Sequence, residues 1–294
     1  MRAYRPSDMP LLQSTVAAWI AEAGRWGYDH IGELPHRVHE NLRGRDLSRL
    51  VHLWDADGLL SGITIAGRFG NAFDCFVAPS HRGTAFETAL LSFACETTRR
   101  ASGAAEILTD GFDRDTVRAE LLTGLGFERF RTWDDIRERD LTDLPTGTTA
   151  EGFTIRSARP TDAAALAEAR NRSFEGAGWT ASAYAEFMRA PGYDPAREIV
   201  AEAPDGRIAA YTVYWTDERN RLGHFEPVGT HEDFRRLGLA AAVMRHAMTE
   251  MRAQGITRAT VNHNAENLAA RGLYERLGFA REYATYGYRK IIGR

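Results

Sequence analysis

The chain has 294 residues, of which 44% are hydrophobic and 26% charged, with a formal net charge of -3. This length is sufficient for two domains with separate hydrophobic cores, and the mildly acidic balance argues against nonspecific binding to nucleic acid or to anionic membranes. Residues 1–10 lack the apolar segment of an export signal, and no run is long enough to cross a membrane, so we expect a cytoplasmic protein. Cys75 and Cys95 are interpreted as buried, reduced thiols.

The two halves of the sequence repeat three motifs in nearly constant register. RAYRPSD at 2–8 matches RSARPTD at 156–162, which begins 154 residues later. Arg82 precedes Arg235 by 153 residues, and the Leu-Gly-Phe triplet at 125–127 recurs 152 residues later. The pattern indicates duplication of a whole domain, because the period far exceeds that of a solenoid repeat. The polar, turn-rich segment 141–150 predicts a linker, which gives domains at 1–146 and 147–294.

Each half predicts the same order of elements, described here for the second. The Arg-x-x-Arg-Pro-x-Asp motif ends a first strand and begins a helix, with Ser7 or Thr161 as the expected N-cap. An Asp-Gly hairpin turn at 205–206 then joins two strands, and a further strand ends at Thr230. The remaining elements are expected to be a helix at 237–254, a strand at 259–262, a helix at about 265–276 and closing strands in 280–290. The fold class is α/β, with a mixed sheet flanked by helices in each half.

The stretch from Glu226 to Met244 is typical of an anion site. It predicts a strand, a short turn and a helix that starts near Gly238. The first amide groups of a helix lack intrahelical partners and carry partial positive charge, and small residues let a diphosphate approach the main chain. The residues expected to form this site are Arg235, Arg236, Leu237, Gly238, Leu239 and Ala240.

This stretch and a second motif together resemble the GNAT superfamily of acyl-CoA-dependent N-acyltransferases. The resemblance implies acetyl-CoA as co-substrate and no metal, with the first motif on the pyrophosphate and the second along pantetheine, where it supplies a tyrosine near the sulfur. It covers the C-terminal third of the chain, in the order of that family. The motifs are Arg235-x-x-Gly238-x-Ala240 and Asn267-x-x-Ala270-x-x-x-Tyr274-x-x-x-Gly278-Phe279.

Glu226 is the candidate general base. An alkyl amine has an ordinary pKa of about 10.4 and must lose a proton before it attacks a thioester. The resemblance places Glu226 on the strand beside the acyl group, while the alternative is a solvated residue at a strand end. Pro227 cannot donate a ladder hydrogen bond, which predicts a break in pairing. The resemblance implies that the segment 228–230 (Val228, Gly229 and Thr230) contacts pantetheine and the thioester carbonyl.

Tyr274 is the candidate acid that protonates the leaving thiolate. The competing interpretation is a core aromatic on a helix face. Asn267 is expected to be a helix cap, a pantetheine ligand or both. His224 lies two residues before Glu226 and would share its face of the strand, either as a proton relay or as an ordinary strand residue.

The first half departs from the motif pattern. Glu87 stands opposite Ala240, where its charge would oppose a pyrophosphate, and Leu122 stands opposite Tyr274. Asp115 stands opposite Asn267. The N-terminal domain is therefore expected to keep the fold without the chemistry, an arrangement that resembles the architecture of mycothiol synthases.

The sequence predicts an acetyl-CoA-dependent N-acetyltransferase that acts by direct attack in a ternary complex on an amine, most simply that of a small molecule. The alternative is a non-catalytic acyl-CoA-binding or regulatory protein. Trp179, Tyr184 and Glu175 are candidates for the acceptor pocket, or else a packed helix with a loop before it. The motif His36-x-x-His39-Glu40 could put metal ligands on one helical face, but no further ligand has recognisable spacing, so a solvated helix is expected in place of a metal site. The sequence leaves the acceptor and the oligomeric state open, and predicts no nucleic-acid or membrane partner.

Overall fold

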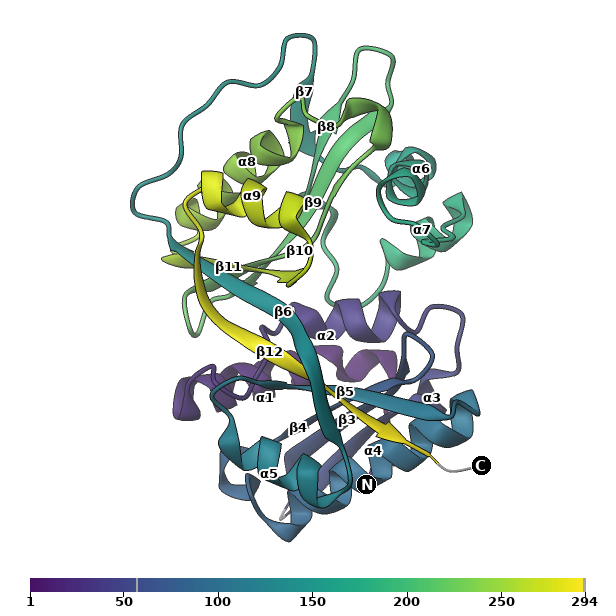
Figure 1. The fold of residues 1–294 in the computed structure, drawn as a ribbon. Helices are drawn as coiled ribbons and strands as arrows, with labels where there is room; N and C mark the ends of the chain where they lie inside the picture. The colour runs from purple at the N-terminus through teal and green to yellow at the C-terminus, as the bar shows by residue number, and fades with distance from the viewer. Residues whose placement is uncertain (57, 293–294) are drawn as a thin grey trace. The chain divides into compact units, whose positions relative to one another are not determined.

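The computed structural model describes residues 1–56 and 58–292, which form two compact units (Figure 1). The first unit comprises Met1–Ile136 with Glu282–Arg294, and the second comprises Arg137–Arg281. The boundary expected between residues 146 and 147 separates the two repeated halves of the sequence. The compact units divide ten residues earlier, and the last segment of the chain belongs to the first unit. Among the described residues, no helix is both long enough and apolar enough to cross a bilayer.

The first unit has a sheet in the order β1-β2-β3-β4-β5-β12-β6. In chain order its elements are β1 (Arg2–Ala3), a 3-10 turn (Pro6–Asp8), α1 (Met9–Ala23), α2 (Glu33–Pro35), a π-helical turn (His36–Glu40), α3 (Leu47–Leu50), β2 (Val51–Ala56), β3 (Leu59–Arg68), β4 (Ala72–Val77), a 3-10 turn (Pro79–His81), α4 (Ala85–Ser102), β5 (Glu106–Phe112), α5 (Thr116–Gly124), β6 (Glu128–Asp140) and β12 (Ala280–Ile291).

The second unit has the order β11-β10-β9-β8-β7, with the end of β6 beside β11. Its elements are β7 (Thr154–Ser157), a 3-10 turn (Pro160–Asp162), α6 (Ala163–Ser173), α7 (Ala181–Phe187), a 3-10 turn (Pro195–Arg197), β8 (Glu198–Glu202), β9 (Ile208–Asp217), β10 (Leu222–Thr230), a 3-10 turn (Glu232–Phe234), α8 (Leu239–Ala253), β11 (Arg258–Asn264) and α9 (Leu268–Arg276).

Alternation along the strands divides each core into two layers. On β8, Ile199 and Ala201 join the cluster under α8, whereas Val200 between them joins the cluster under α6 and α7. On β4, Phe76 packs on the α1 side, and Cys75 packs on the α4 side. Successive side chains of a strand point to opposite faces, so each fully buried strand supplies both layers.

The duplicated Arg-x-x-Arg-Pro-x-Asp motif has the same structure in both copies. Arg2 pairs with Asp8 and Arg156 with Asp162, each at 2.7 Å. Asp8 also accepts the amide of Arg5 at 2.8 Å, in a tight 3-10 turn before α1. The expected capping by Ser7 and Thr161 is wrong, because both lie inside the 3-10 turn and the aspartate one position later bonds back to the chain.

The exact ends of the second-half elements differ slightly from expectation. The strand ends at Thr230 as expected, α8 begins at Leu239 and α9 at Leu268. After Phe279 the chain forms one long strand, β12, in place of separate closing strands. Its residues Thr285–Ile291 pair antiparallel with Glu106–Phe112 of β5, which is why the end of the chain belongs to the first unit.

Candidate active site

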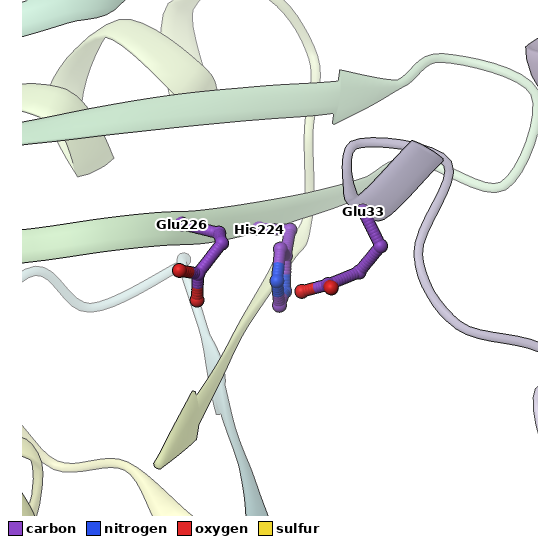
Figure 2. Close-up of side chains that lie close together, drawn as sticks. All are labelled: Glu33, His224 and Glu226. Carbon is purple, nitrogen blue, oxygen red and sulfur yellow. The ribbon is translucent and has the colours of Figure 1, made fainter. Parts of the chain in front are cut away.

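The strand β10 carries the predicted base on an irregular segment. Its pairing with β9 shifts register between Phe225 and Val228, so that an extra residue is accommodated around the cis Glu226–Pro227 bond. The break that Pro227 predicts is therefore confirmed. Figure 2 shows the side chains of Glu226 and His224 leaving β10 on the same side, as expected for residues two apart on a strand. His224 is buried and contacts Thr260 Oγ1 through Nδ1 at 2.8 Å, whereas Glu226 is half-buried.

Two side chains of β9 form hydrogen bonds that hold the irregular segment of β10 in place. The indole Nε1 of Trp215 donates to the carbonyl oxygen of Glu226 at 2.9 Å, and Thr212 Oγ1 donates to that of Pro227 at 3.1 Å. A buried carbonyl needs such a partner, since a lost hydrogen bond costs about 1–3 kcal/mol. These two bonds fix the backbone that carries the Glu226 side chain.

The parallel strands β10 and β11 separate next to Glu226. Within the part of the chain that the structure describes, their pairing joins only Leu222–Phe225 to Arg258–Val261, although β10 continues to Thr230. Val228, Gly229 and Thr230 lie on this continuation. The point where the two strands separate is called the fork. Beyond it, the described main chain of β10 does not pair with β11, and a ligand with amide groups can form hydrogen bonds with it.

Gly229 is required by its neighbour on β9. A Cβ atom added there would lie 2.3 Å from Cζ of Tyr211, a contact that a side chain cannot make. The strand therefore runs directly against the Tyr211 ring. The sequence places Gly229 in the candidate cofactor segment, and the structure gives it this packing role as well.

The N-terminus of α8 lies a few residues beyond the end of β10. Gly238 occupies the N-cap with φ 75°, a left-handed conformation that favours glycine, and no described side chain caps the helix. Nothing lies within 4 Å of a Cβ built at Gly238. Arg235 and Arg236 are exposed beside it. An uncapped helix start flanked by arginines can bind a diphosphate through main-chain amides and charge-assisted hydrogen bonds.

The residues around the start of α8 differ in burial and therefore in role. Leu237 is exposed, and Leu239 is buried in the core under α8, where it anchors the first turn. Ala240 follows it and is half-buried. Small size at Ala240 leaves the first turn accessible, so these residues fit the diphosphate of CoA.

Tyr274 lies on α9 and is 5% exposed. Burial first, and then the negative charge of nearby Glu226, raise the pKa of its phenol, which therefore stays protonated at neutral pH. Its ring packs against Phe279 and His263. Both expectations for Tyr274 thus have a structural counterpart: it is a core aromatic and a protonated donor within the electrostatic reach of Glu226.

Asn267 is the N-cap of α9. Its side-chain oxygen accepts the amide of Ala270 at 3.1 Å. This is the capping role that the sequence left open beside ligand binding, and the side-chain NH2 group remains as a potential donor. The cap fixes the start of the short helix that carries Tyr274.

Arg137 contacts residues next to Tyr274, and sequence reasoning missed it. It is 3% exposed and donates through Nε to His263 Nε2 at 2.9 Å, while its Nη2 pairs with Glu275 at 3.2 Å. His263 lies on β11, and its ring packs on Tyr274. Arg137 belongs to the first half of the sequence, so no motif within the second half could indicate it.

The expected acceptor residues Trp179 and Tyr184 are packed core residues. Tyr184 is fully buried and donates to Glu198 Oε1 at 2.5 Å. The guanidinium of Arg170 lies over the rings of both residues. The alternative of a packed helix is therefore correct, because the aromatic rings surround a buried arginine and contribute to the core under α6 and α7.

Part of the second unit is similar to a known protein family. Residues 163–279 match the model of the acetyltransferase (GNAT) family. This segment of the second unit is a GNAT domain. Curated relatives are similar over nearly the whole chain. The mycothiol acetyltransferase of Salinispora arenicola is 27% identical, with 89% of each chain covered. That of Streptomyces coelicolor is 28% identical over 95% of this chain and 92% of its own.

Solved structures show the same tandem GNAT fold. A tandem GNAT protein from the clavulanic acid biosynthesis pathway aligns with a TM-score of 0.66 at 12% identity, covering 100% of this chain and 98% of its own. A GCN5-related N-acetyltransferase from Sphaerobacter thermophilus aligns with a TM-score of 0.64 at 21% identity, covering 98% and 94%. The expected tandem α/β architecture of two GNAT-like copies is confirmed.

Proposed function

We propose that the second unit transfers the acetyl group of acetyl-CoA to the amine of a small molecule, with Glu226 as general base and Tyr274 as general acid. The observation that carries the proposal is that Glu226 lies at the fork between β10 and β11 and that its charge acts on the phenol of Tyr274. The Glu226 charge contributes to the raised pKa of Tyr274. A carboxylate can accept a proton, and a phenol that stays protonated can donate one.

Cofactor binding is assigned to the segments on either side of the fork. Bound acetyl-CoA supplies an activated acetyl thioester. The α8 N-terminus with Arg235, Arg236 and Gly238 would hold its diphosphate, because the helix start is uncapped and open. Val228 and Thr230 would pair with pantetheine and polarise the thioester carbonyl through their main chain. Asn267 would contribute its side-chain NH2 group.

The proposed reaction moves two protons. Glu226 accepts a proton from the ammonium group, directly or through water, and the free amine then attacks the thioester carbon. As the new C–N bond forms and the C–S bond breaks, Tyr274 donates its phenolic proton to the departing sulfur. The N-protonated amide then gives its second proton, directly or through water, to the Tyr274 phenolate, which restores the phenol. His224 lies on the same side of β10 as Glu226 and is suited to relay the proton outward. No covalent enzyme intermediate is required.

The acceptor is assigned to the class of small amines. Support comes from the curated relatives, whose name, mycothiol acetyltransferase, refers to a small molecule, and whose similarity covers both halves of this chain. An amine related to mycothiol is therefore the first acceptor to test.

The test is thiol release from acetyl-CoA in the presence of a panel of amines, with acetylated product identified by mass spectrometry. We expect release that depends on a small amine, and a decrease of about 100-fold or more in kcat for Glu226→Gln and for Tyr274→Phe. Cofactor binding without thiol release on any amine would contradict the proposal and support a non-catalytic acyl-CoA-binding protein.

A further inference from the structure

The first unit contains a counterpart of the proposed cofactor groove, and its own side chains fill it. Glu87, on the first turn of α4, is fully buried. Its Oε2 accepts the main-chain amide of Gly83 at 2.6 Å, and its Oε1 accepts Nε of Arg118 at 2.6 Å. A carboxylate thus receives an amide of the loop before the helix, which is the contact that a diphosphate would make in the second unit.

Arg118 extends from α5 into the space between β4 and β5. Its Nη1 donates to the carbonyl oxygen of Cys75 at 3.0 Å. Cys75 precedes Val228 by 153 residues, the spacing that also relates Arg82 to Arg235. The guanidinium therefore bonds to β4 at the position where the second unit would contact pantetheine.

The strands around this guanidinium have separated as they have in the second unit. The pairing of β4 with β5 within the described residues is confined to Ala72 and Leu108. The side chains leave a cavity of about 20 Å³ there, lined in part by Cys75, Gly111 and Arg118. Such a space holds about one water molecule and excludes a pantetheine arm.

The arginine of the first unit that corresponds to the proposed phosphate ligand Arg235 is also bound by other residues of the unit. Arg82, the counterpart of Arg235, forms an ion pair with Asp115 and donates to the carbonyl oxygen of Gly27. Asp115 caps α5 by accepting the amide of Arg118 at 3.0 Å, just as Asn267 caps α9. The two copies therefore share the same helix cap. They differ in the charged side chains that lie in the groove.

The second unit has alanine at both filling positions. Ala240 corresponds to Glu87, and Ala270 corresponds to Arg118 through the matching caps. We propose that the Glu87–Arg118 pair is a built-in substitute for the cofactor, with Glu87 in place of the diphosphate and Arg118 in place of pantetheine, and that its removal opens a second acyl-CoA site. The inference rests on the proposed function only in taking the second unit as the template for the groove.

The test combines Glu87→Ala and Arg118→Ala, which gives the first unit the residues of the second. Removing both charges together avoids leaving one of them buried alone. The double change is made in a Gly238→Glu background, which places a negative charge at the diphosphate site of the second unit. Acetyl-CoA is titrated calorimetrically into the wild type, Gly238→Glu and the triple variant.

We expect one site per chain in the wild type, none in Gly238→Glu and one in the triple variant. The matched control is Glu96→Ala with Arg99→Ala in the same background, which removes an ion pair from the same helix where both side chains are about 40% exposed. This control is expected to gain no site. A triple variant that melts cooperatively and binds no acetyl-CoA would overturn the inference.

Hydrogen exchange of the wild type gives a second, independent readout. Acetyl-CoA is expected to protect the segment 228–240 and to leave 75–87 unchanged. Protection of 75–87 in the wild type would show that the groove of the first unit already binds cofactor, and would contradict the substitution. A wild type that binds no acetyl-CoA would refute the proposed function, whereas a site gained in the triple variant would still support this inference.

Discussion

The side chains of Arg137 and His263 meet at 2.9 Å, between Nε of the arginine and Nε2 of the histidine. Because the guanidinium can only donate, His263 Nε2 is the acceptor, and its Nδ1 carries the proton that is donated to the carbonyl oxygen of Asn264 at 2.8 Å. The imidazole ring, fixed at both nitrogens, packs against Tyr274 with ring centroids 5.7 Å apart. A residue of β6 thus positions the proposed acid on α9.

Replacing Arg137 by methionine is expected to lower kcat more than it affects acetyl-CoA binding. The apolar stem is kept, but His263 and the carbonyl of Phe279 lose their donor, which costs about 1–3 kcal/mol of stability. Steady-state kinetics and a denaturant titration measure the two effects. Arg258→Gln is the control, because its half-exposed pair with Glu138 is worth at most about 1 kcal/mol. Equal losses in kcat for both variants would refute the positioning role.

Tyr274→Phe is expected to reduce kcat by a constant factor of about 100 or more between pH 6 and pH 9. Burial and the Glu226 charge raise the pKa of the phenol, so its donor form persists across this range and is lost only above the ordinary value of about 10. The pH profiles of kcat for both proteins provide the measurement. If the ratio of the two rates shrank from pH 7 to pH 9, Tyr274 would be titrating there and its assignment would fail.

Gly229→Ala is expected to destabilise the protein by about 1–3 kcal/mol and to raise the KM for acetyl-CoA, because the new methyl group collides with the Tyr211 ring. Thermal unfolding and initial rates measure these effects. Combining it with Tyr211→Leu should recover part of the loss, which a double-mutant cycle detects as coupling. Gly238→Ala serves as the comparison: it meets open space and bears only the left-handed backbone strain, of about 1–2 kcal/mol. No coupling between positions 229 and 211 would contradict the packing argument.

Asp162→Asn is expected to destabilise the protein at pH 7 by about 1 kcal/mol. Burial alone would raise the pKa of Asp162, but the hydrogen bonds from Arg156 and from the amide of Arg159 outweigh it and lower the pKa. A depressed pKa stabilises the folded state above the unfolded value of about 3.9, and the contribution is lost as pH falls through the folded pKa.

The stability difference between wild type and Asp162→Asn should therefore shrink as the pH falls from the unfolded pKa of Asp162 through its folded pKa. Urea titrations at pH 7 and at pH 3 measure it. Asp143→Asn, which removes the charge of an exposed carboxylate, is the control variant. A difference that persists unchanged at pH 3 would assign the effect of Asp162→Asn to something other than its charge.

Much of the candidate site could be predicted because its signals are short. The glycine and arginines before α8, and the proline after Glu226, act on neighbouring backbone within a few residues, and the structure has the expected helix start and strand irregularity at these positions. The duplicated Arg-Pro-Asp motif likewise folds into the same turn in both copies. Local hydrogen bonding and conformational preference determine these features, whatever the rest of the chain does.

The aromatic cluster near α7 shows where local pattern was insufficient. Trp179 and Tyr184 could equally line a pocket or surround a buried charge, and their spacing is the same in both cases. Only the packing of Arg170 and Glu198 against them decides for the core. The buried arginine comes from α6 and the glutamate from β8, so the deciding contacts are distant in sequence.

The sequence by itself determined the duplication, the alternation of the strands and the place of the proposed catalytic residues within the second half. Only the tertiary structure decided that β12 pairs with β5 and that Arg137 supports α9. The physical reason is that alternation fixes which face of a strand is buried, but it carries no information about which strand edge provides the hydrogen-bonding partner. Strand partners, and every contact that depends on them, are selected by packing between distant parts of the chain.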